Sequence, residues 1–245
     1  MSAEIPEASP PPPEPASKTR KGEATRAKIL ETALDLFRER GYEETTMRGI
    51  AEAAGVAVGN AYYYYRSKEH LIQEFYGRMH ADHLEASREI LASESRFEAR
   101  LLAVVRAKLE VSAPYHRFAG LLFKSAADPE SPLNPFSAES LPVRRQATEL
   151  MAEVLKGSDL RVSRRLASEL PDLLWLYLMG VILFWVHDRS PGAWRSYRLV
   201  ERTVPIVARL ITLARVPFFR PLLRQLLSLL VDLKGDEGPP PPDPR

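Results

Sequence analysis

The stretch TTMRGIAEAAGVAVGNAYYYY, residues 45–65, predicts two short helices joined by a tight turn. In the first of these, Ile50, Ala51 and Ala54 recur at the spacing of one helix face. Gly55 follows, and a residue without a Cβ takes the left-handed conformation that ends a helix at little cost. Two helices joined in this way are typical of a helix-turn-helix, whose second helix enters a DNA major groove.

The residues of this stretch suggest separate roles for its two helices. Thr45 or Thr46 can cap the first helix by accepting a hydrogen bond from a free backbone N–H. The second helix, residues 57–64, carries few charges, and its N-terminal part is expected to face DNA. There an amide can reach base edges, tyrosine hydroxyls can reach phosphates, and apolar groups can contact a thymine methyl. The candidates for these contacts are Val58, Gly59, Asn60, Tyr62 and Tyr63.

Residues 41–72, GYEETTMRGIAEAAGVAVGNAYYYYRSKEHLI, resemble the DNA-binding head of the tetracycline-repressor-type (TetR) transcriptional regulators. The matching positions are the pair Gly41–Tyr42, the two threonines, Ile50-Ala51, Ala54-Gly55-Val56, the tyrosine run and Ser67-Lys68. Three positions depart from the usual choices of the family. Ala57 replaces a capping serine, Val58 replaces a polar or basic residue, and His70 replaces a frequent glutamate. The resemblance implies a homodimer on double-stranded DNA, a palindromic operator, and repression as the default mode.

Positive and polar side chains around the motif are candidates for contact with phosphate. Arg26 lies in a basic segment, and Thr46 and Arg48 belong to the bracing helix. Lys68 falls in the first turn of the next helix, where free N–H groups already suit an anion. The resemblance assigns Lys68 to phosphate contact. A solvated first turn is the alternative for Arg26, and an ordinary surface lysine is the alternative for Lys68.

Composition limits the other classes of function. The chain has 245 residues, 45% of them hydrophobic, which is enough for a substantial core. Its net charge of +2 does not indicate a general polyanion binder. Without cysteine it has no disulfide framework, which fits a cytoplasmic location. The longest apolar run, residues 173–186, is shorter than the roughly 20 residues that span a bilayer, so we expect no stable membrane insertion.

Apolar periodicity predicts an all-α protein with four segments. These are a proline-rich disordered tail at 1–17, the DNA-binding domain at 18–66, a helical ligand-binding and dimerisation domain at 67–233, and a second proline-rich tail at 234–245. A long loop is expected at 127–141. The expected helices outside the motif are 25–40, 67–93, 96–112, 115–125, 142–156, 173–186, 196–213 and a short amphipathic one at 222–230.

The larger domain is expected to provide both the dimer interface and a small-molecule pocket. Residues 173–186 are apolar on every side, so neighbours in the chain and a second subunit must cover them. Pro171 is expected to start or kink this helix. The resemblance places the interface on this helix and on 196–213. A mainly apolar pocket for a small hydrophobic effector is expected, with core packing as the alternative for each wall residue: Phe118, Phe123, Trp175, Tyr177, Met179 and Phe184.

The two alternative classes of function are an enzyme and a helical binding protein without specific DNA binding. An enzyme is disfavoured, because the chain has no nucleophile elbow, no phosphate-cradling glycine loop and no set of metal ligands, and no cofactor is implied. His80, Asp82 and His83 could share a helix face, but two histidines without a firm third ligand are usually solvated. The other alternative is a helical small-molecule-binding or membrane-associated protein whose head no longer binds specific DNA. The apolar Ala57 and Val58 leave room for it.

Overall fold

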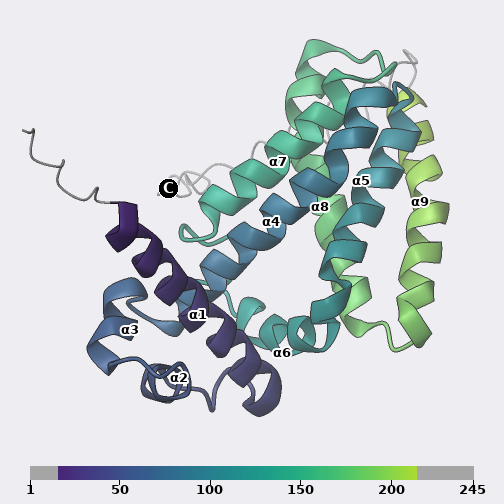
Figure 1. The fold of residues 1–245 in the computed structure, drawn as a ribbon. Coiled ribbons are helices and arrows are strands. Elements are labelled where there is room, and N and C mark those ends of the chain that lie inside the picture. Colours follow the sequence, from purple (N-terminus) through teal and green to yellow (C-terminus); the bar gives the residue numbers. More distant parts are fainter. Residues whose placement is uncertain (1–15, 214–245) are drawn as a thin grey trace, which may run out of the picture. The chain divides into compact units, whose positions relative to one another are not determined.

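The structure is a computed structural model that describes residues 16–213, and throughout these residues the regular structure is helical (Figure 1). The predicted tails and the predicted helix at 222–230 lie outside them, apart from Ala16 and Ser17. The chain divides into two compact units, Met1–Leu71 and Ile72–Arg245. We call their described parts the head, residues 16–71, and the body, residues 72–213.

The head consists of three helices and the first turn of a fourth. They are α1 (Ala16–Arg40), α2 (Met47–Ala53), α3 (Val58–Tyr64) and the start of α4 (Lys68–Ser93). Helix α1 begins nine residues before the start that apolar spacing predicts, because residues 16–24 are largely good helix formers that need no buried face to continue the helix. The core of the head is formed by Ile29, Leu30, Ala33, Leu34, Phe37, Ile50, Ala51, Ala54, Ala61 and Tyr65.

The turn between α2 and α3 has the geometry that its sequence predicts. Thr46 caps α2, since its Oγ1 accepts a hydrogen bond from Gly49 N at 3.1 Å. Gly55 takes a φ of +64°, and Val56 N donates to Ala51 O at 2.9 Å, which closes the end of α2. Ala57 begins α3 without a side-chain cap, so the first N–H groups of that helix find no side-chain acceptor at this position.

The body contains the rest of α4 and five further α-helices within the described residues (Figure 1). They are α5 (Phe97–Ser112), α6 (His116–Ala126), α7 (Leu141–Lys156), α8 (Arg164–His187) and α9 (Trp194–Leu213), with 3-10 turns at Ala113–Tyr115 and Pro191–Ala193. Helix α8 packs against α7 and α9, and α9 also packs against α5. One apolar core joins these four helices.

Pro171 lies inside helix α8 and does not start it, although a helix start was one of the two alternatives predicted for this residue. The helix begins at Arg164, seven residues before the proline, and Ser163 caps it by accepting from Leu166 N at 3.3 Å. Leu166 and Leu170 form a small buried cluster of their own, so packing stabilises the turns before Pro171. Among the described residues α8 alone has the length and composition of a membrane span, a test that core helices of soluble proteins also pass. It packs against α7 and α9, and 33% of its most apolar 18-residue window is buried.

The predicted loop between α6 and α7 is built from consecutive turns. Asp128, Asn134 and Ser137 accept hydrogen bonds from backbone N–H groups two or three residues further on. The side chain of Gln73 on α4 donates to Pro132 O at 2.8 Å and to Ser140 Oγ at 3.1 Å, and so ties the loop to the body. These contacts make the loop an ordered part of the body.

The turn between α8 and α9 is organised by one buried carboxylate. Asp188 Oδ1 accepts from the backbone N and the hydroxyl of Ser190, at 2.9 and 2.7 Å. Its Oδ2 accepts from the corresponding groups of Ser196, at 2.8 and 2.7 Å. Burial alone would raise the pKa of Asp188, but these four hydrogen bonds lower it from 3.8 to about 2. The turn is therefore strongest when Asp188 is ionised.

Replacing Asp188 by asparagine is expected to lower the free energy of unfolding by about 2 kcal/mol at pH 7. Because the folded pKa lies below the unfolded one, this stabilisation is present above pH 4 and is lost as the pH falls towards 2. Urea denaturation of both proteins between pH 7 and pH 2.5 measures the difference, which should shrink with acidification. Asp35→Asn, at an exposed site on α1, is the control. A difference that stays constant with pH would contradict this role.

Candidate nucleic-acid interface

Helix α3 presents the residues that the sequence assigns to base contact on the surface of the head. Val58, Gly59, Asn60 and Tyr62 are exposed, and Tyr63 is the most exposed of them at 81%. On the opposite side Ala61 is fully buried. The five predicted residues therefore come together on one short, accessible surface, which we call the α3 face.

The four consecutive tyrosines divide between this surface and the core. Tyr65 is 2% exposed, and its hydroxyl donates to Arg26 O at 3.3 Å, which links the end of α3 to α1. Tyr64 is half-buried, and its ring meets that of Tyr63 edge-on with centroids 5.1 Å apart. Tyr65 and Tyr64 thus hold the helix in place, while Tyr62 and Tyr63 stay available to a ligand.

Three of the predicted phosphate contacts lie on α1 and α2 of the head. Arg48 is exposed on α2, next to Thr46 at its start. Arg26 is exposed on α1, and its guanidinium lies 5.6 Å from the centroid of the Tyr65 ring. Thr46 is exposed as well, although its Oγ1 is already engaged in the α2 cap. The geometry leaves all three side chains accessible to a DNA backbone.

Lys68 has structural contacts that the sequence did not indicate. Its ammonium donates to Tyr42 O at 2.8 Å and to Glu43 O at 3.4 Å, and it lies 4.4 Å from the centroid of the Tyr42 ring. The Tyr42 hydroxyl in turn donates to Glu69 Oε1 at 2.6 Å. Lys68 therefore joins the first turn of α4 to the segment before α2, and any phosphate would share the ammonium with these carbonyls.

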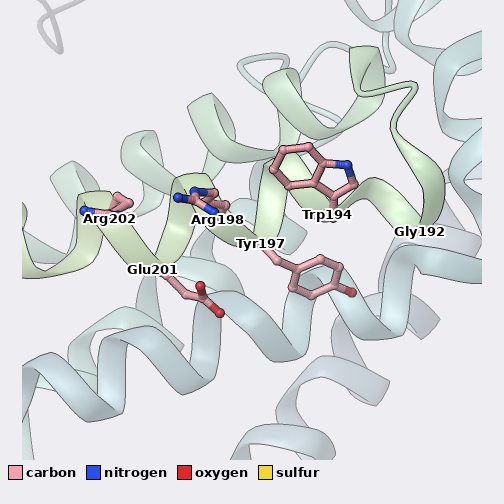
Figure 2. A pocket seen from close by; sticks show the side chains of 6 residues that line it. All are labelled: Gly192, Trp194, Tyr197, Arg198, Glu201 and Arg202. Carbon is pink, nitrogen blue, oxygen red and sulfur yellow. The ribbon is translucent and has the colours of Figure 1, made fainter.

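The six predicted wall residues of the effector pocket have different environments. Phe118 and Trp175 are buried, Phe123 and Met179 are half-buried, and the hydroxyl of Tyr177 is 2.6 Å from Thr203 Oγ1. Phe184 is exposed on the outer face of α8. None of the six lines the surface hollow of about 440 Å³ beside α9 (Figure 2). The residues that line that hollow are Gly192, Trp194, Tyr197, Arg198, Glu201 and Arg202.

The hollow beside α9 has both aromatic and charged walls, and it was not indicated by the sequence. Tyr197 and Glu201 lie on the side of α9 that faces α5, whereas Arg198 and Trp194 point away from it (Figure 2). Arg106 of α5 pairs with Glu201 at 2.9 Å and lies 5.6 Å from the Tyr197 ring. These contacts join α5 to α9. Within residues 16–213 no group of three His, Cys, Asp or Glu side chains could hold a metal ion.

In the three-helix head, α2 and α3 are joined by a turn at Gly55, and α3 is short and accessible. This arrangement defines a helix-turn-helix DNA-binding protein. Two family models match the chain. "Bacterial regulatory proteins, tetR family" matches residues 29–75, and "Tetracyclin repressor-like, C-terminal domain" matches residues 100–229. Because these matches cover most of the chain, it belongs to the TetR family of transcriptional regulators, which are not enzymes.

Individual relatives agree with this assignment. The HTH-type transcriptional repressor KstR2 of Rhodococcus jostii is 36% identical over 104 residues, 42% of this chain and 51% of that repressor, so the chain spans about half its length. The probable HTH-type transcriptional regulator ArpR of Pseudomonas putida is 29% identical over 69% of this chain and 80% of its own.

A solved structure extends the likeness to the body. FadR of Thermus thermophilus, described as a TetR-family transcriptional repressor in complex with lauroyl-CoA, has a TM-score of 0.55 and is 26% identical. The match covers 73% of this chain and 92% of that one. The all-α fold, with the helix-turn-helix followed by a helical C-terminal domain, is therefore that of the family.

Proposed function

We propose that the protein is a ligand-responsive repressor that binds a palindromic operator as a homodimer and is released by a mainly apolar small molecule. The α3 face carries this proposal, because it exposes an amide and two tyrosines on a helix whose other side is anchored in the head core. Val58 and Gly59 add apolar contact and close backbone approach. Arg26, Thr46, Arg48 and Lys68 would fix the register on the phosphates. A regulator of this kind works in the cytoplasm, where the DNA lies.

Dimerisation is supported by the apolar surface of α8 and α9. Leu176, Gly180, Leu183 and Phe184 are exposed at spacings of one helix face of α8. Ile206, Leu210 and Leu213 are exposed on α9, and Leu210 reaches 60%. Exposed apolar patches of this kind mark interaction surfaces. A second copy would cover the patch by symmetry, and Phe184 then belongs to the interface more naturally than to the pocket wall.

Replacing both Ile206 and Leu210 by glutamate is expected to weaken the dimer roughly 100-fold or more, because burying the two carboxylates would cost several kcal/mol. Analytical ultracentrifugation over a range of concentrations measures this, and circular dichroism should show unchanged helix content. Leu84→Glu, at an exposed apolar position on α4, is the matched control and should leave the dimer intact. A double variant that dimerises like the wild type would place the interface elsewhere.

The class of effector is supported by the body and by one relative. The aromatic candidates Phe118, Phe123 and Trp175 suit an apolar molecule, whereas Tyr177 and Met179 pack against the core that joins α5, α7, α8 and α9. Since the Thermus thermophilus relative was solved with lauroyl-CoA, a medium-chain acyl compound is the first effector to test. Helix α4 starts in the head at Lys68 and continues through the body to Ser93, so it is the element that would transmit binding.

Selection of binding sites from random duplex DNA, at two salt concentrations, tests this function. We expect a palindrome whose half-sites are about one helical turn, 34–36 Å, apart. Salt-sensitive binding without a consensus would show that only phosphates are contacted. No binding by the ligand-free protein would favour a head that has lost its role on DNA.

A further inference from the structure

The inward-facing side of α4 changes from apolar to polar along its length. Its first turns bury Leu71, Ile72, Phe75 and Met79, and its later turns bury His80, His83 and Ser87. Two of these three polar side chains are satisfied. His83 Nε2 lies 2.8 Å from Val104 O on α5, and the Ser87 hydroxyl donates to His83 O at 2.7 Å.

His80 is different, because its Nε2 is buried without a hydrogen-bond partner among the residues that the structure describes. The side chain is only 4% exposed. A buried polar atom left unpaired costs about 1–3 kcal/mol, so an atom without a partner in the chain calls for a water molecule or a ligand. Gln73 Oε1 is the other such atom in the described chain, and it lies seven residues earlier on the same face of α4.

The helix packing brings Lys108 of α5 towards this unpaired imidazole. His83 meets Val104 of α5 at 2.8 Å, Lys108 follows Val104 by one helical turn, and the His80 ring lies 6.4 Å from that of His83. Lys108 of α5 is close enough to both histidines to lower the pKa of each, although burial is the larger cause for both. Burial also lowers the pKa of Lys108 to about 8, against the attraction of Asp82. With a pKa of about 8 the lysine is mainly charged at pH 7, and with a pKa of about 3 His83 is neutral. In residues 16–213 Lys108 forms no hydrogen bond and no ion pair within 4 Å.

An apolar surface begins on the same helix. The Phe75 ring lies 4.9 Å from that of Tyr115 and 5.6 Å from that of Phe118, measured between centroids. Tyr76 stands one turn before His80, and burial raises its pKa to about 12, so its hydroxyl stays protonated. The rings around Phe75 and the unpaired Nε2 of His80 thus follow one another along α4. A ligand with an apolar body and a polar end needs this order of contacts.

We propose that His80 Nε2 and the Lys108 ammonium bind the acyl oxygen of the effector, which is the carboxylate of a free acid or the carbonyl of a thioester. The acyl chain then packs against Phe75, Tyr115 and Phe118. This inference rests on the proposed function, since it names the chemistry that the effector presents to the body. It adds polar anchors on α4 and α5 to the mainly apolar pocket that the sequence predicts.

Calorimetric titration of the full-length protein without DNA tests the site with three probes of equal chain length. These are laurate, lauroyl-CoA and dodecyltrimethylammonium, which carries a cation in place of the acyl oxygen. We expect one acyl molecule per protomer, and binding of the ammonium compound at least about tenfold weaker, because it offers no acceptor to a charged donor. If neither acyl probe binds the wild-type protein, the proposal is wrong.

His80→Phe and Lys108→Met remove the two donors while keeping much of their volume. Each is expected to raise the dissociation constant of the bound acyl probe about tenfold or more, as loss of a charge-assisted or buried hydrogen bond does. His80→Gln should recover part of the affinity, which guards against a folding defect in His80→Phe. Lys124→Met, at an exposed lysine on α6, is the matched control.

The outcomes separate this site from the proposed function. Variants that bind the acyl probes as tightly as the wild type would overturn the site, whatever the protein does on DNA. Failure of the wild-type protein to select a palindrome would instead overturn the proposed function, and the titration would still test the site. If the His80 and Lys108 variants lose affinity for laurate alone, the two side chains bind a carboxylate. If they lose affinity for lauroyl-CoA alone, they bind a thioester carbonyl.

Discussion

Replacing Arg100 by methionine is expected to lower the free energy of unfolding by about 3–5 kcal/mol and the melting temperature by roughly 10 °C. The side chain is 3% exposed and donates to four backbone carbonyls. Its Nε donates to Val154 O at 2.9 Å and its Nη2 to Glu153 O at 2.7 Å, in the last turn of α7. Its Nη1 donates to Leu91 O at 2.7 Å and Glu94 O at 2.6 Å, around the end of α4.

The size of this effect follows from what the guanidinium satisfies. The last carbonyls of a helix have no partner within the helix and carry the negative end of its dipole. The buried Arg100 donates to carbonyls at the C-terminal ends of both α4 and α7. Its loss therefore leaves several buried carbonyl oxygens without a donor. Methionine keeps most of the volume and none of the donors.

Thermal and urea denaturation measure the loss, and Arg96→Met is the control. Arg96 is four residues away, exposed, and paired only with Glu94 at 3.2 Å, so its replacement should cost less than about 1 kcal/mol. Gly157→Ala is expected to destabilise as well, since a Cβ there would lie 2.5 Å from Arg100 Nη2. An Arg100→Met protein as stable as the Arg96→Met control would show that the carbonyls find other partners.

The double variant Asn60→Ala, Tyr63→Ala is expected to weaken binding to the selected operator about 100-fold or more, because each base contact contributes about 1–3 kcal/mol. Both side chains are exposed, so the protein should remain a folded dimer. Electrophoretic mobility shift measures the affinity, and sedimentation measures the oligomer. Gln146→Ala, at an exposed amide on α7, is the control.

The non-specific component of binding should survive these two changes. Arg26, Arg48 and Lys68 are untouched, so affinity for random duplex and its salt dependence should stay close to the wild type. An operator affinity within threefold of the wild type would mean that the bases are read by another element.

Much of the head was predictable from its sequence because local rules decide it. The Thr46 cap and the left-handed Gly55 are backbone requirements that few residue types meet, so residue identity alone indicates them. The exposure of Asn60 and Tyr63 opposite buried Ala61 follows from helical spacing. In the body, apolar periodicity located most helices to within two residues for the same reason.

The features that sequence reasoning missed depend on contacts between distant segments. Arg100 looks like any charged residue on a helix, and only folding brings the ends of α4 and α7 around it. His80 was predicted to be solvated, and only the packing of α4 within the body buries it. The start of α8 before Pro171 was also missed, since the packing of Leu166 and Leu170 ahead of the proline is a tertiary effect.

In the proposed complex, two copies of the α3 face read the two halves of one operator. Sedimentation velocity with labelled duplexes, carrying either the whole selected palindrome or one half-site, measures how many protomers bind. We expect two protomers on the palindrome, and affinity for the half-site reduced at least about 100-fold because one recognition helix then lacks its bases. A single protomer bound with full affinity to the half-site would rule out this arrangement.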